Sequence, residues 1–362
     1  MSKTNLGTLM LFVLALVIFP VGIRAQERRK IIIDQDCAGP AGSDLQAVLV
    51  FVQSAQVDPL GITVVSGDEW RDEEVAHTLR LLEIIGRTDI PVVPGAVFLL
   101  INSQEETARW EKLFGKIRYQ GAWNWGKPHA PFFVPELPEG NPNTKAAAED
   151  AAHFMIRMVH AYPHQVTIYA AGPLTNLALA CALDPQFPTL THELVFMGGS
   201  LSTSVDDPEF SATPRREFNL RWDPEAAHIV LRAPWPKITC TTVDISVKTR
   251  LTKEMIGRIG RAPTPLARYL AQYAPEGYMW DELAAAAWLD ASLITRERQL
   301  FMDVEVDHGA EYGNTVTWLP GDNPGLGEQL VHVQMDVNTE QLYRMFVDLM
   351  MRPTPRAPAK GN

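Results

Sequence analysis

Three aspartates lie around one turn near the start of the chain. Ile31-Ile32-Ile33 leads into Asp34-Gln35-Asp36, and after a glycine-bearing turn Ser43-Asp44 begins a helical pattern. By themselves these residues could be turn-forming aspartates and a serine that caps a helix. Three carboxylates around one tight turn, however, repel one another unless a cation is present, and their hard oxygen atoms suit Ca²⁺ or Mg²⁺. The segment is therefore a candidate site for a divalent cation.

Two later segments carry further polar groups. Trp280-Asp281-Glu282 precedes an Ala-rich helical pattern, where negative charge favours a helix N-terminus even without a ligand. Glu217 and Asn219 follow an irregular stretch. On an extended segment they would project on the same side, where they could hold sugar hydroxyls, but ordinary loop polarity explains them equally well.

Apolar runs typical of strands alternate with helical patterns along most of the chain. This order predicts an α/β fold with a Rossmann-like core, in which helices flank a mostly parallel central sheet. Ligands of such sheets bind beyond the carboxyl ends of the strands, which is where the first acidic segment lies. Strands are expected at 30–33, 60–65, 91–93, 165–170, 193–197, 238–243, 302–306, 315–319 and 330–335. Helices are expected at 45–54, 73–85, 145–160, 175–182, 224–231, 261–273 and 283–289.

Two stretches interrupt this alternation. Residues 99–143 combine tryptophans and phenylalanines with many prolines and glycines, and residues 202–216 are polar and irregular. We expect both to be long loops, which in compact domains are usually functional or disordered. The folded part is expected to be a single domain over residues 30–351, followed by a disordered tail over residues 352–362.

The first 25 residues have the pattern of a secretory signal peptide. Lys3 precedes an apolar run from Leu9 to Phe19, and a small-residue cleavage site ends near Ala25. That run is too short to cross a bilayer, so we expect export to the periplasm or beyond the cell and no stable membrane anchor. The net charge of −11 argues against nucleic acid as a partner. The three cysteines have neither zinc-site nor disulfide-framework spacing.

Taken in order, several short segments resemble the inosine-uridine-preferring nucleoside hydrolases, from residue 30 to about residue 351. Each segment alone is a weak signal, but their order and spacing together are specific. The segments are Ile31–Ala47, Gly61–Asp68, Ala171–Ala178, Val195–Gly199, Glu217–Asn219, Asp223–Ala227 and Trp280–Ala284. The resemblance implies a nucleoside hydrolase that uses Ca²⁺ to cleave the N-glycosidic bond of ribonucleosides, releasing ribose and the free base.

The resemblance also implies roles for individual residues. The Ca²⁺ ligands would be three carboxylates and one backbone carbonyl, those of Asp36, Asp44, Asp281 and Ala171. Asp34 would lie behind these ligands and orient them, and Asp36 would also accept the proton of the attacking water. The substrate would contact Asp68, Met197, Glu217, Asn219 and Trp280. Nearby carboxylates would stabilise an oxocarbenium-like transition state.

Three positions depart from the family pattern. The first turn is longer around Gly39-Pro40-Ala41, and Ser43 replaces the first of two adjacent aspartates, which removes an expected contact to the sugar 2′-hydroxyl. Ala171 stands where threonine is common, without consequence if only its carbonyl binds. Trp280 stands where many members carry a histidine thought to protonate the leaving base, and indole is no general acid. Stacking or a proton could come instead from other groups, although each more commonly packs in a core or loop: Tyr119, Trp123, Trp125, His129 and Tyr278.

Two other functions fit parts of this pattern. An exported nucleoside- or sugar-binding protein would also combine an α/β fold with an aromatic-lined cleft, but it does not need four converging carboxylates. A hydrolase of a different glycosyl substrate would keep the calcium site and explain Ser43 and Trp280. The family resemblance implies a homo-oligomer, for which no single segment of the sequence is evidence.

Overall fold

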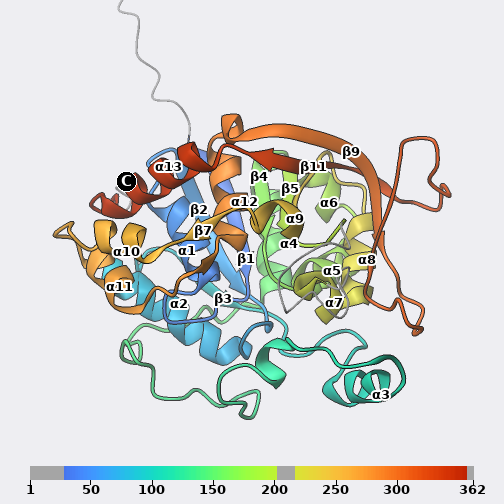
Figure 1. The fold of residues 1–362 in the computed structure, drawn as a ribbon, viewed down its shortest axis with the longest axis horizontal. Coiled ribbons are helices and arrows are strands. Elements are labelled where there is room, and N and C mark those ends of the chain that lie inside the picture. The colour runs from blue at the N-terminus through green and yellow to red at the C-terminus, as the bar shows by residue number, and fades with distance from the viewer. Residues whose placement is uncertain (1–27, 202–216, 357–362) are drawn as a thin grey trace, which may run out of the picture.

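The computed structural model describes residues 28–201 and 217–356, and these form one nine-stranded sheet with helices on both faces (Figure 1). In this sheet six of the neighbouring strand pairs are parallel, and only the pairs of β9 with β10 and β11 are antiparallel; a separate antiparallel pair joins β7 (Arg250–Leu251) to β8 (Gly277–Tyr278). The predicted α/β fold with a mostly parallel sheet is therefore confirmed. The strands in sheet order are β10 (Thr315–Trp318), β9 (Ile294–Val304), β11 (Gln329–Val337), β6 (Ile238–Thr241), β5 (Glu193–Met197), β4 (Val166–Ala170), β1 (Arg29–Gln35), β2 (Val57–Val64) and β3 (Val92–Pro94).

The alternation of side chains along β1 divides the core into two layers. Ile31 and Ile33 belong to the apolar cluster on one face of the sheet, whereas Ile32 belongs to the cluster on the other. Because helices cover both faces, the central strands read as continuous apolar runs. The first face is covered by α1 (Ser43–Val52), α2 (Arg71–Ile85), α9 (Val243–Ser246), α10 (Lys253–Ile259), α11 (Pro265–Tyr273), α12 (Trp280–Leu289) and α13 (Thr339–Met351). The second is covered by α4 (Ala151–Ala161), α5 (Thr175–Leu183), α6 (Phe187–Leu190) and α8 (Pro224–Arg232).

The first predicted loop contains a helix that was not expected. Helix α3 (Gln104–Phe114) lies at the periphery of the molecule (Figure 1), and the one-turn 3₁₀ helix Gly121–Trp123 follows it. Ser103 caps α3 by accepting a hydrogen bond from the Glu106 backbone, a serine–glutamate spacing typical of helix starts. The prediction of an unbroken loop over residues 99–143 is therefore wrong. The second predicted loop, residues 202–216, lies outside the described residues.

Helix boundaries differ from the prediction where capping residues decide them. Helix α4 begins six residues later than expected, because Asp150 has extended backbone angles and its side chain caps the helix by accepting the His153 N–H. The helix expected over residues 261–273 begins at Pro265, after the Thr264 cap, and follows the separate helix α10. Helix α13 was not expected at all.

The ends of the chain are described only in part. The predicted signal peptide lies outside the described residues. At the other end, the carbonyls of Arg352 and Pro355 accept hydrogen bonds from Gln53 and Arg87, so the first residues of the predicted tail contact the domain. The remainder, 357–362, lies outside the described residues. Within the described ranges, every helix is too short or too polar to cross a bilayer.

Candidate active site

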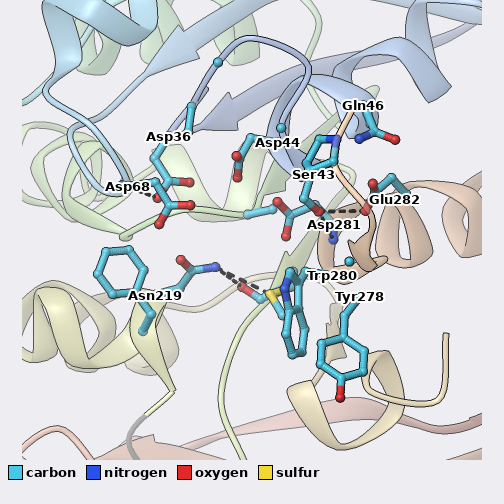
Figure 2. A pocket seen from close by; sticks show the side chains of 18 of the residues that line it. Asp36, Ser43, Asp44, Gln46, Asp68, Asn219, Tyr278, Trp280, Asp281 and Glu282 are labelled. Atoms are coloured by element: carbon cyan, nitrogen blue, oxygen red, sulfur yellow. Dashed lines mark hydrogen bonds between the residues drawn. The ribbon is translucent and has the colours of Figure 1, made fainter. Parts of the chain in front are cut away.

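A cavity of about 450 Å³ lies at the carboxyl edge of the parallel strands, where the polar segments were expected to meet. Its walls include residues that follow β1, β2 and β4, the end of β5, and the first turn of α12. Figure 2 shows the carboxylates of Asp36, Asp44, Asp68 and Asp281 facing one common space. These four side chains are separated by up to about 245 positions in the sequence, and the fold brings them together.

Asp36 follows the last residue of β1 and is enclosed by two glycines. A Cβ atom on Gly67 or Gly172 would lie 2.0 Å or 2.6 Å from an Asp36 carboxylate oxygen, so only glycine fits at either position. The Asp36 Oδ2 atom accepts the Asp68 N–H at 3.1 Å, whereas its buried Oδ1 atom has no hydrogen-bond partner among the described residues. Burial, together with the charges of Asp68 and Asp281, raises the pKa of Asp36 well above its ordinary value.

Asp44 and Asp281 lie in the first turns of α1 and α12. The Gln35 amide donates to Asp281 Oδ2 at 3.0 Å, and the Tyr169 hydroxyl donates to the Asp281 carbonyl at 2.9 Å, so both ends of Asp281 are held. Burial raises the pKa of Asp281 to about 7. Burial and the charge of Asp281 raise the pKa of Asp44 well above its ordinary value.

The predicted supporting groups lie behind and beside these carboxylates. Asp34 is fully buried and accepts hydrogen bonds from Thr63 at 2.6 Å and Asn176 at 2.8 Å, and burial raises its pKa to about 7. Its backbone carbonyl accepts the N–H of Ala171 at 3.0 Å, which places Ala171 in the cavity wall. Asp44 and Asp281 are hydrogen-bonded to each other. Together with the unpaired oxygen of Asp36, their carboxylates offer only oxygen donors, the chemistry that a hard cation such as Ca²⁺ prefers.

Asp68 lines the cavity beside Asp36 and is hydrogen-bonded to the Tyr119 side chain. Burial raises the pKa of Asp68 to about 6. Sequence reasoning considered Tyr119 only as a source of stacking or of a proton. The structure shows that it comes from the segment after α3 and holds Asp68 in place, a long-range pairing that no local pattern in the sequence indicates.

Glu217 and Asn219 both line the cavity, but the segment that carries them is helical and not extended as expected. Glu217 caps helix α7 (Phe218–Trp222) by accepting the backbone N–H groups of Asn219 and Leu220, and it also accepts the Gly199 N–H at 2.8 Å. The Asn219 amide donates to the Met197 carbonyl at 3.2 Å, which brings Met197 into the same wall.

Ser43, which stands where the resemblance implied an aspartate, is not an isolated hydroxyl. Its Oγ atom donates to the buried carboxyl of Glu282 at 2.7 Å, and both residues line the cavity (Figure 2). Burial raises the pKa of Glu282 to about 8. Sequence reasoning did not identify Glu282 as a site residue, because its partner lies 239 positions away along the chain.

Aromatic rings form the opposite wall. The rings of Trp280 and Tyr278 lie 4.8 Å apart, and Trp125 packs against Tyr119 at 5.4 Å; all four residues line the cavity. Trp123, by contrast, is buried against Trp222.

The histidine considered from the sequence, His129, and the histidine on α8 lie outside the cavity wall. His129 pairs with Glu73 and not with a residue of the cavity wall. His228 on α8 hydrogen-bonds to Asp303 at 2.8 Å and is not part of the cavity wall.

The chain is similar to known proteins over most of its length. Residues 31–344 match the family model described as inosine-uridine preferring nucleoside hydrolase. A protein of Arabidopsis thaliana named probable uridine nucleosidase 2 is 32% identical over 68% of this chain and 69% of its own length. The pyrimidine-specific ribonucleoside hydrolase RihA of Shewanella woodyi is 31% identical over 67% of this chain and 69% of its own length.

Solved structures share the fold. The purine-preferring ribonucleoside hydrolase of Gardnerella vaginalis superposes with a TM-score of 0.72 at 22% identity, covering 89% of this chain and 98% of that one. A plant nucleoside hydrolase gives a TM-score of 0.70 at 23% identity, over 90% of this chain and 99% of that one.

Proposed function

Because the chain belongs to the inosine-uridine preferring nucleoside hydrolase family and is a nucleoside hydrolase, we propose that it cleaves ribonucleosides at a calcium site with Asp36 as general base. The observation that carries this proposal is the unpaired, buried Oδ1 atom of Asp36, which faces the same space as two further carboxylates. The groups that would hold Ca²⁺ are the carboxylates of Asp36, Asp44 and Asp281 and the backbone carbonyl of Ala171. When bound there, Ca²⁺ would lower the pKa of a neighbouring water.

Asp36 is suited to accept the proton of the attacking water. Its Oδ2 atom is held by the Asp68 backbone, so the carboxylate cannot rotate freely, and Oδ1 remains available. Burial favours protonation of this carboxylate, which strengthens it as a base once it is ionised. Asp34 lies behind the site, and its contacts with Thr63 and Asn176 keep the end of β1 in position.

The remaining wall residues position the substrate. Asn219, Glu217 and Asp68 present polar groups next to the carboxylates, and these groups suit sugar hydroxyls. The nearby negative charges also stabilise the positive charge that develops on the sugar as the glycosidic bond breaks. Met197 lines the cavity beside them.

The leaving base is placed against the aromatic wall. Trp280 and Tyr278 offer adjacent ring faces, and a purine or pyrimidine stacks favourably on such faces. Trp280 cannot donate a proton to the base as the family's histidine would. We therefore expect the fastest turnover with bases that leave without protonation, and pyrimidine ribonucleosides are the first to test because the relatives quoted above carry such names.

The N-terminal pattern supports export of this enzyme to the periplasm or beyond the cell, with cleavage near Ala25. In that location the enzyme would act on nucleosides outside the cytoplasm. Detection of the mature protein in the exported fraction, with an N-terminus near residue 26, would test this part of the proposal.

The hydrolase is tested by ribose release from a panel of purine and pyrimidine ribonucleosides, with added Ca²⁺ and after chelation. We expect calcium-dependent release, and a loss of about 10²–10⁴-fold in kcat for Asp36→Asn, the range that general-base catalysis contributes. Asp150→Asn, at an exposed helix cap, is the matched control and should retain full activity. Calcium binding without ribose release from any nucleoside would contradict the proposal and favour a different glycosyl substrate or a binding protein.

A further inference from the structure

A second cluster of possible metal ligands adjoins the cavity and takes no part in the proposed hydrolysis. Glu73 and His77 are four residues apart on helix α2 and therefore project from the same face, and Glu69 lies in the loop just before the helix. One ligand atom from each of the three side chains lies within 4.8 Å of the other two. Glu73 and His77 are buried, and Glu69 is half-buried.

The imidazole of His77 is oriented as in many metal sites. Its Nδ1 atom lies 2.5 Å from Glu139 Oε1, and a carboxylate at that position fixes the proton on Nδ1. The Nε2 atom then presents its lone pair to the cluster. His77 is only 2% exposed, and its Nε2 atom lies 3.6 Å from Glu69 Oε2, beyond hydrogen-bond distance.

The spacing of these atoms suits an ion between them. Two ligands of a tetrahedral zinc ion at bond lengths of about 2.1 Å lie about 3.4 Å from each other, close to the observed separation of His77 Nε2 and Glu69 Oε2. The negative charge of the carboxylates around His77 also favours a bound cation. Glu139 is 7% exposed, and its Oε2 atom has no hydrogen-bond partner among the described residues. Two other basic side chains lie near the cluster. His129 pairs with Glu73 at 2.7 Å, and Arg80 donates to the Glu83 carboxylate and to the backbone carbonyl of Glu139, not to its carboxylate.

We propose that Glu69, Glu73 and His77 bind a zinc-class transition-metal ion, with Glu139 as the positioning residue for His77. An imidazole nitrogen with two carboxylates suits such an ion better than the calcium proposed for the all-oxygen site. The competing arrangement is a metal-free ion pair with a protonated imidazole. Burial lowers the pKa of His77, while Glu139 and Glu69 raise it, with a net upward direction. The two arrangements differ in whether Nε2 carries a proton or a metal.

The cluster contacts the turn that is longer than in the family. The Gly39 N–H donates to Glu69 Oε2 at 3.4 Å, and a Cβ atom on Gly39 would lie 2.3 Å from the His77 ring. This turn connects Asp36 to Asp44, and Gly39 and Glu69 both line the cavity. A metal ion at this position would therefore connect helix α2 to the turn that carries two proposed calcium ligands.

Calorimetric titration of the chelated and dialysed enzyme with Zn²⁺, in saturating Ca²⁺, tests the proposal without any use of activity. We expect one zinc ion per chain. His77→Gln should remove this binding, and Glu139→Gln should weaken it by about 10–100-fold, as changes at an orienting carboxylate usually do. The matched control is His153→Gln, an exposed histidine that also pairs with a carboxylate and should bind zinc as the wild type does.

Three outcomes would overturn the proposal. These are an absence of zinc binding by the wild-type enzyme, binding that His77→Gln leaves unchanged, and equal losses in His77→Gln and His153→Gln. If His77→Gln fails to fold, nitrogen-15 NMR of the wild-type imidazoles decides the question. A shift of a neutral, Nδ1-protonated imidazole on addition of Zn²⁺ supports the site, and a doubly protonated ring that does not respond contradicts it.

Discussion

At the scale of single residues, the pair of Ser43 and Glu282 changes the interpretation of one departure from the family pattern. From the sequence, serine in place of aspartate appeared only to remove a carboxylate. The structure places the Glu282 carboxyl 2.7 Å from the serine hydroxyl, within the same wall of the cavity. A carboxyl group of α12, that of Glu282, is therefore present at this position and is hydrogen-bonded to the Ser43 hydroxyl. The Asp281 backbone N–H donates to the same hydroxyl at 3.4 Å.

Ser43→Ala should therefore weaken substrate binding more than it slows the chemical step. The variant removes the hydroxyl from the cavity and leaves the Glu282 carboxyl without its donor, a change that costs about 1–3 kcal/mol for a buried group. We expect KM to rise by about tenfold, with a smaller change in kcat, in steady-state assays on the preferred nucleoside. Glu282→Gln keeps an acceptor for Ser43 and should have the smaller effect on KM. An unchanged KM in Ser43→Ala would exclude the pair from substrate binding.

Trp280 allows a second test at this scale. Replacement by histidine introduces a group that titrates near neutral pH, so Trp280→His should increase kcat on purine nucleosides by about tenfold or more if proton donation limits the wild-type enzyme. Trp280→Phe keeps a ring without an N–H donor and should show no such gain. Rates measured on inosine and uridine would separate the two effects, and the same rate on inosine for both variants would disprove the leaving-group argument.

At the scale of elements, Asp223 connects three parts of the chain near the site. Its carboxylate accepts the Ala226 N–H at the start of α8, the Thr175 hydroxyl at the start of α5 and the Leu100 N–H ahead of α3. The residue is fully buried, so water cannot replace these bonds. Helix α7, which carries Asn219, ends at the same aspartate.

Asp223→Ala should cost about 3 kcal/mol in the free energy of unfolding, because it removes a helix cap and leaves buried donors unpaired. Asp150 caps α4 in the same way but is exposed, so Asp150→Ala should cost only about 1 kcal/mol. Urea unfolding of both variants measures the difference. Equal losses would mean that the buried contacts of Asp223 contribute nothing beyond the cap.

Elements with strong local signals were predictable from the sequence, and those decided by distant partners were not. The apolar runs of β1, β4 and β5 predicted these strands to within two residues, because strands covered on both faces must be apolar throughout. Helix α7 was not predicted, since five residues after an irregular stretch carry little periodicity and the Glu217 side chain caps them. Helix α3 could have been found from the Ser103 to Glu106 spacing.

At the scale of the whole molecule, no local spacing predicted that Asp281 would meet Asp36 and Asp44. Residues 36 and 44 are joined by one turn, but Asp281 arrives from α12, which packs beside α1 on the same face of the sheet. That arrangement depends on the sheet order, in which β4 lies next to β1, and on the parallel direction of β1, β2, β4 and β5, whose carboxyl ends meet at one edge. Family resemblance was therefore needed to group the three aspartates, whereas their acidic character was visible from the sequence alone.

We expect this convergence to make the stability of the whole fold depend on pH and, if the proposed site binds it, on Ca²⁺. Burial raises the pKa of Asp281 to about 7 from an ordinary value of 3.8. Between these pH values the metal-free folded state retains a proton that the unfolded state has lost, so its stability falls as pH rises through this window. Ca²⁺ bound at the proposed site would have to displace that proton below pH 7, so its affinity should fall as pH falls.

We therefore expect the chelated protein to melt at a higher temperature at pH 6 than at pH 8, and Ca²⁺ to raise the melting temperature more at pH 8. Ca²⁺ at a free concentration about 100 times its Kd should add about 2.7 kcal/mol to the free energy of unfolding. Asp44→Asn removes one of the repelling charges, so the chelated variant should melt above the chelated wild type at pH 8, without a further rise on addition of Ca²⁺. Differential scanning calorimetry of both proteins at the two pH values measures these shifts. If Ca²⁺ moved the wild-type and Asp44→Asn transitions equally, the ion would be acting elsewhere on the molecule, and the three aspartates would have to be reassigned.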